Sequence, residues 1–375
     1  MEKLTNTVEL RKNNRNRMFK FIYEAEKPVT KQDISVGLGL SLPTVSQNLS
    51  ELLEEKKIEY CGTNLSTGGR KPRAIRVVGD AKIAVGISLT AEKISFAAID
   101  LNINEVAYDS VKLHFTEDER FYKKVAELLE KFIDDNRLDR KSMLGVGITV
   151  PGIIFQGEDL VKFAPTLSSY KIKVGALKAL IPYPSVIQND ANASGFAEWW
   201  SNSGKGNMVY LFLERGVGGS ILMRGEGYLG DNGRSGEFGH MCIVPDGRRC
   251  SCGQLGCFEA YCSTSVITDV FGLTLEEFFA RVGNKEGKYV AAWEEYLRNL
   301  SRGISNIRAI LDCEIVVGGV LSPYMEPYLD QLRDMVSELN FYENSGSFVR
   351  LCRYKTKSTS VGVALYFISD YINNI

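Results

Sequence analysis

The sequence predicts a two-lobed α/β domain that follows a small N-terminal domain of the winged helix-turn-helix type. Three observations lead to this fold. Residues 1–73 carry more basic than acidic side chains, whereas the rest of the chain is acidic. Strand-like and helix-like segments alternate after residue 79, and a strand-rich stretch opens each half of that region. The length of 375 residues allows two or three domains.

Charge is distributed unevenly along the chain. Residues 1–73 contain 13 Lys and Arg against 9 Asp and Glu, although the formal net charge of the whole chain is −1. A small basic excess on an otherwise acidic chain is typical of an attached nucleic-acid-binding segment. No secretory signal follows Met1 and no apolar run could span a membrane, so we expect a cytoplasmic protein without a membrane partner. In that compartment the eight cysteines should be free thiols or metal ligands.

The first domain, residues 1–78, is expected to contain three helices over about residues 8–25, 31–37 and 42–56. Thr30 and Ser41 are suitable N-caps for the second and third helices, and Gly37 and Gly39 supply the turn between them. Two short strands over about residues 58–61 and 73–78 should follow, joined by a flexible basic loop that fits a wing. This order of elements is typical of a helix-turn-helix domain.

The third helix carries the side chains suited to DNA. Val45, Leu49 and Leu52 form an apolar face, and short polar side chains on or beside the other face suit base edges in a major groove. Basic residues of the following loop would contact phosphates or enter the minor groove. The predicted DNA-contacting residues are Ser41, Thr44, Ser46, Gln47, Asn48, Arg70, Lys71 and Arg73. The alternative is a helical subdomain with a solvated polar face and a hydrated linker.

The remaining 300 residues are predicted to form two lobes. Strands are expected over about residues 81–89, 94–101, 105–113, 144–150, 208–213, 219–223 and 313–317. Helices are expected over about residues 121–136, 191–201, 274–282, 288–311, 327–339 and 359–372. We assign residues 79–190, with the C-terminal helix (residues 359–375), to the first lobe, and residues 191–358 to the second. The cleft between two such lobes is where ligands tend to bind.

A metal-ligand cluster is the sharpest local feature of the second lobe. His240, Cys250, Cys252 and Cys257 supply one imidazole and three thiolates within eighteen residues, the set that structural zinc prefers. Gly253 and Gly256 would let the backbone fold back so that the thiolates converge. We therefore predict a structural Zn²⁺; a chance cluster of buried thiols is the alternative. Cys242 and Cys262 are expected to be packed thiols rather than ligands, and His114 a structural residue in a strand.

The Gly236-Glu-Phe-Gly-His240 and Cys250-x-Cys-Gly-x-x-Gly-Cys-x-Glu259 motifs, the Pro151-Gly152 turn and the helix-turn-helix together resemble the ROK family (repressors, open reading frames and sugar kinases). The N-terminal domain makes the chain similar to NagC/XylR-type regulators within it. The resemblance covers essentially the whole chain. It implies an actin/hexokinase-like (ribonuclease-H-like) fold with a hexose-like sugar in the cleft.

The resemblance also implies which residues bind the sugar. They are Gly152, Asn189, Asp190, Glu237, His240 and Glu259. Carboxylates and amides suit the vicinal hydroxyls of a ring, and His240 can use one nitrogen for zinc and the other for a hydroxyl. Asp190 matches the general base of kinase relatives; its alternative role is a helix N-cap. Thr166 stands where relatives often carry Asn, which puts one sugar contact in doubt.

The turns that hold a triphosphate in kinase members are altered. The first reads Ser88-Leu-Thr-Ala-Glu92 in place of Asp-x-Gly-Gly-Thr, and the second reads Glu214-Arg-Gly-Val-Gly-Gly219. Glu92 and Glu214 would oppose a phosphate, although Arg215 could partly offset Glu214. We therefore expect no enzyme activity and no catalytic residue, with Asp190 retained as the vestige of the kinase base.

These features predict a DNA-binding transcriptional regulator, most simply a repressor, whose operator affinity responds to a sugar or sugar derivative. Its partners would be operator DNA, the sugar effector and further copies of the chain, as a homodimer or homotetramer, because helix-turn-helix domains usually read two half-sites. An active sugar kinase with an attached DNA-binding domain is the main alternative. A regulator controlled by a protein partner is a third.

Overall fold

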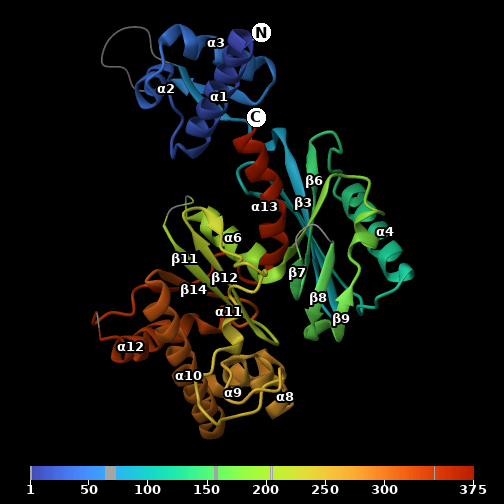
Figure 1. The fold of residues 1–375 in the computed structure, drawn as a ribbon, viewed down its shortest axis with the longest axis vertical. Coiled ribbons are helices and arrows are strands. Elements are labelled where there is room, and N and C mark those ends of the chain that lie inside the picture. The colour runs from blue at the N-terminus through green and yellow to red at the C-terminus, as the bar shows by residue number, and fades with distance from the viewer. Residues whose placement is uncertain (1, 64–72, 156–158, 203, 205, 342) are drawn as a thin grey trace.

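The N-terminal domain contains three helices and a two-stranded sheet (Figure 1). The computed structural model describes residues 2–63, 73–155, 159–202, 204, 206–341 and 343–375. The helices are α1 (Glu2–Glu24), α2 (Lys31–Leu38) and α3 (Leu42–Glu54), and the antiparallel strands are β1 (Ile58–Thr63) and β2 (Arg73–Val77). The predicted order of elements is confirmed, but α1 begins about two turns earlier than its apolar pattern indicates.

Local capping sets the helix-turn-helix. Thr30 Oγ1 accepts from the Asp33 amide, and the Asp33 carboxylate accepts from the Thr30 amide, so the two residues form the expected capping box. Gly39 ends α2 in a left-handed conformation with φ of 66°. Ser41 caps α3 by accepting from the Thr44 amide at 3.3 Å. These local side chains cap the helices on either side of the turn, and Arg17 of α1 also donates to the Leu38 carbonyl oxygen at the end of α2 at 3.3 Å.

Two five-stranded sheets form the body of the protein. The first has the order β10-β6-β3-β4-β5, and the second has the order β13-β12-β11-β14-β15. In both sheets a three-strand antiparallel meander is extended by two parallel strands, so the two sheets have the same topology. The strands of the first sheet are β3 (Ile83–Leu89), β4 (Lys93–Asp100), β5 (Glu105–Lys112), β6 (Met143–Val150) and β10 (Ser185–Asn189). Those of the second are β11 (Met208–Leu213), β12 (Val217–Met223), β13 (Glu226–Gly227), β14 (Glu314–Gly318) and β15 (Val349–Leu351).

A third, smaller sheet consists of strands that the sequence did not predict. It consists of the antiparallel strands β7 (Ile153–Phe155), β8 (Leu160–Ala164) and β9 (Ser169–Ile172), followed by the short helix α5 (Gly175–Lys178). This sheet leaves the end of β6 directly after the Pro151-Gly152 turn. It therefore forms one wall of the region between the two large sheets.

Helices cover both faces of the large sheets. Helix α4 (Glu119–Asp135) packs on the outer face of the first sheet, and α13 (Ser358–Asn373) packs on the inner face over β3 and β6 (Figure 1). Helix α6 (Asp190–Ser201) packs on β11 and β12 and against α13, so these two helices lie between the sheets. The other helices of the second half are α7 (Glu259–Cys262), α8 (Ser265–Phe271), α9 (Leu275–Gly283), α10 (Gly287–Leu311), α11 (Ser322–Met325) and α12 (Leu329–Leu339). Helices α10 and α12 join the second sheet in its own apolar core.

The close approach of α6 and α13 requires a glycine. A Cβ atom on Gly362 of α13 would overlap the carbonyl oxygen of Ala193 in α6. Because Gly362 has no side chain, the two backbones can touch at this point. The helix pair therefore behaves as one packed unit in the middle of the molecule.

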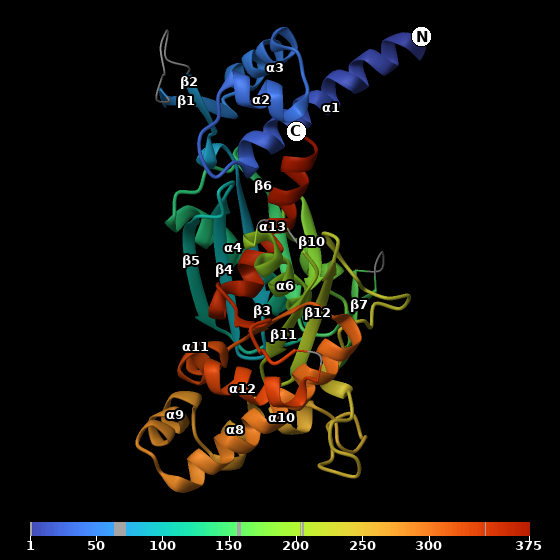
Figure 2. The ribbon, with the colours of Figure 1, turned by 90° about the vertical axis from the view of Figure 1, so that its left-hand side faces the viewer.

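The N-terminal domain is anchored to the end of α13. Phe19 and Tyr371 contact edge to face with ring centroids 6.2 Å apart. Asn16 Nδ2 donates to the carbonyl oxygen of Asn373 at 3.1 Å, and Lys20 Nζ donates to its side chain at 3.2 Å. Figure 2 shows α1 resting on this end of α13 while its N-terminal half projects away from the body. Among the residues that the structure describes, none of the helices is long and apolar enough to cross a membrane.

Candidate functional site

A cleft of about 380 Å³ lies between the third sheet, the start of α6 and the β11–β12 turn. This volume lies within the range of about 300–1,000 Å³ that is typical of small-molecule sites. All six residues predicted to contact a sugar line the cleft, and Thr166 lines it as well. They are Gly152, Asn189, Asp190, Glu237, His240 and Glu259. The structure thus brings together residues that are up to 107 positions apart in the printed sequence.

Asn189 organises the floor of the cleft. Its Oδ1 atom accepts from the Asn192 amide at 3.0 Å and so caps α6, while its Nδ2 atom donates to the Gly152 carbonyl oxygen at 3.0 Å. Asn189, not Asp190, is therefore the N-cap, which removes the alternative role considered for Asp190. The Asp190 Oδ1 atom accepts from the adjacent Ala191 amide at 2.9 Å.

The packing of the turn requires a glycine at position 152. Its φ of 113° favours glycine, and a Cβ atom there would lie 2.7 Å from the Phe163 carbonyl oxygen and 2.8 Å from Val161 Cγ1. Both neighbours belong to β8. The glycine therefore allows the third sheet to fold back beside β6.

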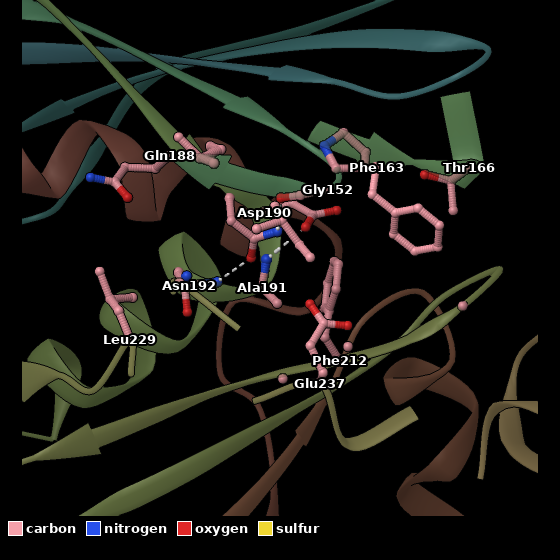
Figure 3. Close-up of a pocket in the computed structure, with 18 of the residues that line it drawn as sticks. Gly152, Phe163, Thr166, Gln188, Asp190, Ala191, Asn192, Phe212, Leu229 and Glu237 are labelled. Atoms are coloured by element: carbon pink, nitrogen blue, oxygen red, sulfur yellow. Dashed lines mark hydrogen bonds between the residues drawn. The ribbon is translucent and has the colours of Figure 1, made fainter. Parts of the chain in front are cut away.

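Two carboxyl groups face each other across the cleft. Figure 3 shows Asp190 on the α6 side and Glu237 on the opposite wall, with Phe163 and Thr166 at one end and Leu229 at the other. Burial above all, with a smaller contribution from the negative charge of Glu237, raises the pKa of Asp190 to about 6. Burial also raises the pKa of Glu237, although nearby His240 opposes that shift. The pair is suited to accept hydrogen bonds from ring hydroxyls near neutral pH.

Glu259 and Glu214 are each bonded to a backbone amide at the edge of the cleft. Glu259 Oε2 accepts from the Val217 amide at 3.1 Å, and its Oε1 atom accepts from Ser251 Oγ at 2.9 Å. Glu214 Oε1 accepts from the Val320 amide at 3.0 Å, directly after the Gly318-Gly319 turn. Burial raises the pKa of Glu214 to about 8, so its carboxyl is mostly neutral at pH 7. Glu214 therefore blocks this turn by occupying the amide, and the expectation that its charge opposes an anion is corrected.

A Cys₃His cluster stands beside the cleft. The ligand atoms of His240, Cys250, Cys252 and Cys257 all lie within 4.8 Å of one another. Cys252 Sγ and Cys257 Sγ are 3.7 Å apart, close to the edge of about 3.8 Å expected for a tetrahedron with Zn–S bonds of about 2.3 Å. Gly253 and Gly256 have positive φ values of 91° and 77°, as the hairpin of thiols requires. These four residues could hold a metal ion.

His240 connects the cluster to the cleft. Its Nδ1 atom is 3.9 Å from Cys250 Sγ, and its Nε2 atom is 3.9 Å from Glu237 Oε2. One ring nitrogen therefore faces the thiols and the other faces the cleft. Cys262 is a packed thiol as predicted, but Cys242 is exposed, so its assignment as packed is wrong. Its backbone pairs with that of Cys257 in an isolated antiparallel bridge.

The first altered turn, residues 88–92, does not place Glu92 in the cleft. Glu92 is exposed on the β3–β4 turn and lies 3.0 Å from His114 Nδ1, and it is not among the residues that line the cleft. The expectation that Glu92 opposes a phosphate is therefore not supported. His114 follows β5 as an exposed residue, not as a structural residue within a strand. Arg215 pairs with Asp269 at 2.9 Å, which directs its charge away from Glu214.

Most of the predicted DNA-contacting side chains in α3 are accessible, but Asn48 is not. Only 2% of Asn48 is exposed, and its Nδ2 atom donates to the Thr44 carbonyl oxygen at 2.8 Å. Asn48 is therefore wrong as a base-contacting residue. Gln47 is fully on the surface, and Thr44 and Ser46 are half-buried. Arg73 lies over the Tyr60 ring at 5.1 Å, whereas Arg70 and Lys71 lie outside the described residues.

The basic residues of α1 are partly neutralised within the domain. Arg11 pairs with Glu51 and Arg15 pairs with Glu55, both acidic partners on or next to α3. The net charge of the segment therefore overstates the free positive charge near the recognition helix. The sequence could not reveal these pairs, because each joins residues 40 positions apart.

The fold and the cleft define a two-lobed actin- and hexokinase-type domain joined to a winged helix-turn-helix. The sequence matches the ROK family over residues 84–369, and the chain belongs to this family. It is similar to the xylose repressor of Caldicellulosiruptor bescii, with 27% identity over 373 residues that cover 92% of this chain and 93% of that protein. The predicted family and fold class are thereby confirmed.

Two solved structures have a similar fold. A ROK family transcriptional regulator, a homologue of the E. coli MLC protein, superposes with a TM-score of 0.78 at 19% identity and covers 97% of each chain. A ROK family glucokinase from Streptomyces griseus in complex with glucose and AMPPNP superposes with a TM-score of 0.64 at 22% identity. That match covers 76% of this chain and 98% of the glucokinase.

Proposed function

We propose that this protein is a cytoplasmic, sugar-responsive transcriptional repressor that releases operator DNA when a sugar occupies the cleft. The observation that carries the proposal is the course of α6, which begins in the cleft and ends against the DNA-binding domain. The similarity to a xylose repressor over nearly the whole chain supports it. We also propose the domain division at residues 78/79 and 190/191, with residues 359–375 completing the first lobe.

Helix α6 connects the two sites by direct contacts. Asn189 and Asp190 stand at its N-terminus in the cleft. Near its other end, Trp200 Nε1 donates to the Tyr23 hydroxyl of α1 at 3.3 Å, and the two rings are 6.4 Å apart. A ligand that moves the start of α6 would therefore also displace α1. Coupling of this kind needs a ligand that binds one arrangement better than the other.

A buried carboxylate, Glu198, connects α6 to the segment of residues 350–354 that leads into α13. Glu198 is completely buried in the middle of the helix. Its carboxylate accepts from Arg350 at 3.0 Å and from the backbone amides of Arg353 and Tyr354 at 2.6 and 3.1 Å. Removing one partner of such a buried, hydrogen-bonded charge is strongly destabilising. The segment that leads into α13 is thus held to α6 and would move with it.

The DNA-binding surface is proposed to consist of the start of α3 and the wing. Thr44, Ser46 and Gln47 would contact base edges, with Ser41 at a phosphate as well as capping the helix. Arg73, together with Arg70 and Lys71, would contact phosphates or the minor groove. A homodimer or homotetramer would place two such domains on two half-sites.

The experiment that tests this function begins with DNA selected from a random pool by the full chain. Fluorescence anisotropy then measures DNA affinity with and without candidate sugars, and Gln47→Ala provides the control. We expect a sugar to weaken DNA binding at least tenfold, and Gln47→Ala to lose sequence preference while its sugar-induced rise in melting temperature persists. Sequence-specific binding that no sugar changes would favour regulation by a protein partner and contradict the proposal.

The Cys₃His cluster is proposed to hold structural zinc. Three thiolates and an imidazole fill all four ligand positions, so the ion would have no open position for chemistry. When bound, the zinc would brace the loop that carries His240 and Glu259 beside the cleft.

The rival function is an active sugar kinase. The Glu214 carboxyl accepts from the Val320 amide, and the buried Ser88 hydroxyl bonds to Thr359 Oγ1 at 3.0 Å, so the side chains that replace the usual phosphate-binding residues of both turns are bonded within the protein. We therefore propose that the protein is not a kinase. ATP-dependent phosphorylation of a sugar that Asp190→Asn abolishes would establish the rival.

A further inference from the structure

We propose that the cleft selects an uncharged sugar and excludes sugar phosphates and sugar acids. This inference rests on the proposed function and specifies the chemical class of its effector. It depends on two features of the site: where the backbone amides of the cleft point, and which charges line its walls.

Four backbone amides around the cleft, those of Ala191, Asn192, Val217 and Val320, are already bonded to side chains of the protein itself. At the start of α6, the Ala191 amide donates to Asp190 and the Asn192 amide donates to Asn189. On the opposite side, the Val217 amide donates to Glu259. Helix N-termini and turn amides are the usual binding sites for phosphate in proteins. Here a phosphate could use them only by displacing an internal side chain.

The amide beyond the glycine turn follows the same pattern. The Val320 amide donates to the buried Glu214 carboxyl. The Glu214 side chain therefore stands where a phosphate would have to bind, and bringing an anion into this buried position would be opposed by the lack of solvent. The same arrangement recurs at three places around the cleft: a carboxyl group accepts from an amide that faces it.

The charges on the cleft walls are also unfavourable for an anion. Asp190, Glu237 and Glu259 contribute acidic groups to the lining, and Glu214 adds a carboxyl that is mostly neutral at pH 7. Among the described lining residues, Lys178 is the single lysine or arginine, and its Nζ atom is bonded to both oxygens of Asp159 at 3.1 and 3.3 Å. An anionic ligand would have to break that pair to gain a cation.

Further cations are near. Arg215 stands between the lining residues Glu214 and Gly216 but pairs with Asp269 at 2.9 Å, and Lys93 is close enough to Glu214 to oppose the rise of its pKa. Arg234 is exposed on the loop between two lining residues, Gly233 and Ser235, but does not itself line the cleft. The experiment below therefore tests both Lys178 and Arg234.

The same walls suit a neutral polyol. The carboxyl groups accept hydrogen bonds from hydroxyls, and Gln188, Asn192 and Thr166 can donate to ring or hydroxyl oxygens. Ile153, Phe212 and Leu229 provide apolar surface for the C–H faces of a ring. A protein with this selectivity would respond to the sugar before its phosphorylation and would ignore the product of that reaction.

The test compares free sugars with their phosphate esters on the full chain. D-xylose, D-glucose and N-acetyl-D-glucosamine are paired with xylose 5-phosphate, glucose 6-phosphate and N-acetylglucosamine 6-phosphate. Thermal shift and calorimetry give the Kd of each, and anisotropy reports release of the selected DNA. We expect at least one free sugar to bind ten times more tightly than its ester and to release the DNA.

The possible outcomes separate the two proposals. An ester that binds as tightly as its free sugar and releases DNA would overturn the selectivity and leave the regulatory function intact. Absence of binding by all six compounds would overturn both. Arg234→Met, outside the lining, should change the Kd of the free sugar less than threefold, and a tenfold loss of ester binding in either Arg234→Met or Lys178→Met would contradict the inference.

A matched pair of variants tests the blocked amide itself. Glu214→Gln keeps an oxygen that can accept from Val320, whereas Glu214→Ala exposes the amide. We expect inorganic phosphate to raise the melting temperature of Glu214→Ala by at least a few degrees more than that of Glu214→Gln. Equal shifts in the two variants would show that Glu214 does not exclude the anion.

Discussion

The Asp190 carboxyl titrates close to physiological pH. Its pKa of about 6 reflects burial above all, and the facing Glu237 adds to the shift. A group with this pKa changes from a hydrogen-bond donor to a full acceptor as the pH rises from 5 to 7. The ligand affinity of the cleft should therefore depend on pH in a range where most carboxylates do not titrate.

We expect sugar affinity to rise between pH 5 and pH 7.5, with a midpoint near 6 and a total change of about tenfold. The ionised carboxylate accepts two hydroxyl hydrogen bonds, whereas the protonated form loses part of that capacity. Calorimetric titration at several pH values measures this change. Asp190→Asn serves as the control, because its affinity should be lower and should lose the step near pH 6.

Asp190→Asn should also stabilise the sugar-free protein. A carboxyl whose pKa is higher in the folded chain than in the unfolded chain lowers the free energy of unfolding, fully above pH 6 and not at all below about pH 4. We expect a gain of about 1–2 kcal/mol at pH 7.5, since part of the side chain reaches solvent. Denaturant unfolding at pH 7.5 and pH 4 checks this, and a loss of stability at pH 7.5 would contradict it.

Asn48 shows how residue type can mislead when spacing does not. The apolar stripe of α3 runs through Val45, Leu49 and Leu52, and position 48 fits the same stripe at i+3 from Val45. The structure buries Asn48 with these residues, and its side chain bonds to the helix backbone. The polar side chain of Asn48 suggests a contact with DNA, whereas the helical period places position 48 on the buried face of α3.

At the scale of elements, α6 is the part of the molecule on which the proposed regulation depends. Removing the hydroxyl of Tyr23 breaks its bond to Trp200 while preserving both rings. We expect Tyr23→Phe to reduce the sugar-induced loss of DNA affinity by about three- to tenfold, in line with a hydrogen bond of about 0.5–1.5 kcal/mol. Anisotropy titrations with and without sugar measure this ratio.

A matched control is available for this variant. Tyr122 lies in α4 on the far face of the first sheet, and its buried hydroxyl has no hydrogen-bond partner among the described residues. Tyr122→Phe should leave the coupling unchanged. If both variants behaved alike, or if Tyr23→Phe kept the full sugar effect, α6 would not transmit the signal through this contact.

The α6–α13 contact makes a second prediction at this scale. Gly362→Ala should destabilise the protein by about 1–3 kcal/mol or more, because the added methyl group overlaps the Ala193 carbonyl oxygen. Gly283→Ala at the end of α9 is the control, since a Cβ atom there meets nothing within 4 Å and alanine is the better helix former. Chemical denaturation of both variants measures the difference.

Elements with strong local signals were predictable, and short ones were not. Thr30, Asp33 and Ser41 set the ends of α2 and α3 through neighbours in sequence. The strands β7 and β15 have three residues each, too few to show alternation, and β10 stands between Pro184 and the start of α6. These strands form only because longer neighbours pair with them.

At the scale of the whole molecule, the proposed zinc should support both stability and ligand binding. We expect metal removal by chelation, or Cys252→Ser, to lower the melting temperature by more than about 5 °C, since about 1 kcal/mol shifts a domain of this size by about 2–4 °C. Sugar affinity should fall about tenfold or more, because His240 and Glu259 lose their support.

Elemental analysis of the purified chain would give the metal content directly. Cys242→Ser provides the matched control, because this thiol is exposed beside the cluster and outside the ligand set. It should keep the metal, the melting temperature and the sugar affinity. A chelated protein that melts like the untreated one would show that the cluster is not a structural metal site.

The cleft could be predicted as a set of residues but not as a shape. The resemblance to the ROK family implied Asn189, Glu237 and Glu259 as sugar-binding residues, and the fold brings them together in the cleft. The bonds of Glu214 to Val320 and of Lys178 to Asp159 could not be predicted, because each joins residues of one lobe that are 106 and 19 positions apart in the sequence.

Helix α13 gives the molecule an unusual order of assembly. It covers the inner face of β3 and β6 and also supports α1, yet nearly the whole chain separates it from these partners. During synthesis, the apolar inner face of the first sheet and the surface of α1 that contacts α13 would stay exposed until residues 358–373 leave the ribosome. A chain that has not yet formed α13 cannot anchor its DNA-binding domain. Incomplete chains released from stalled ribosomes before this point would need chaperones to cover their exposed apolar surface.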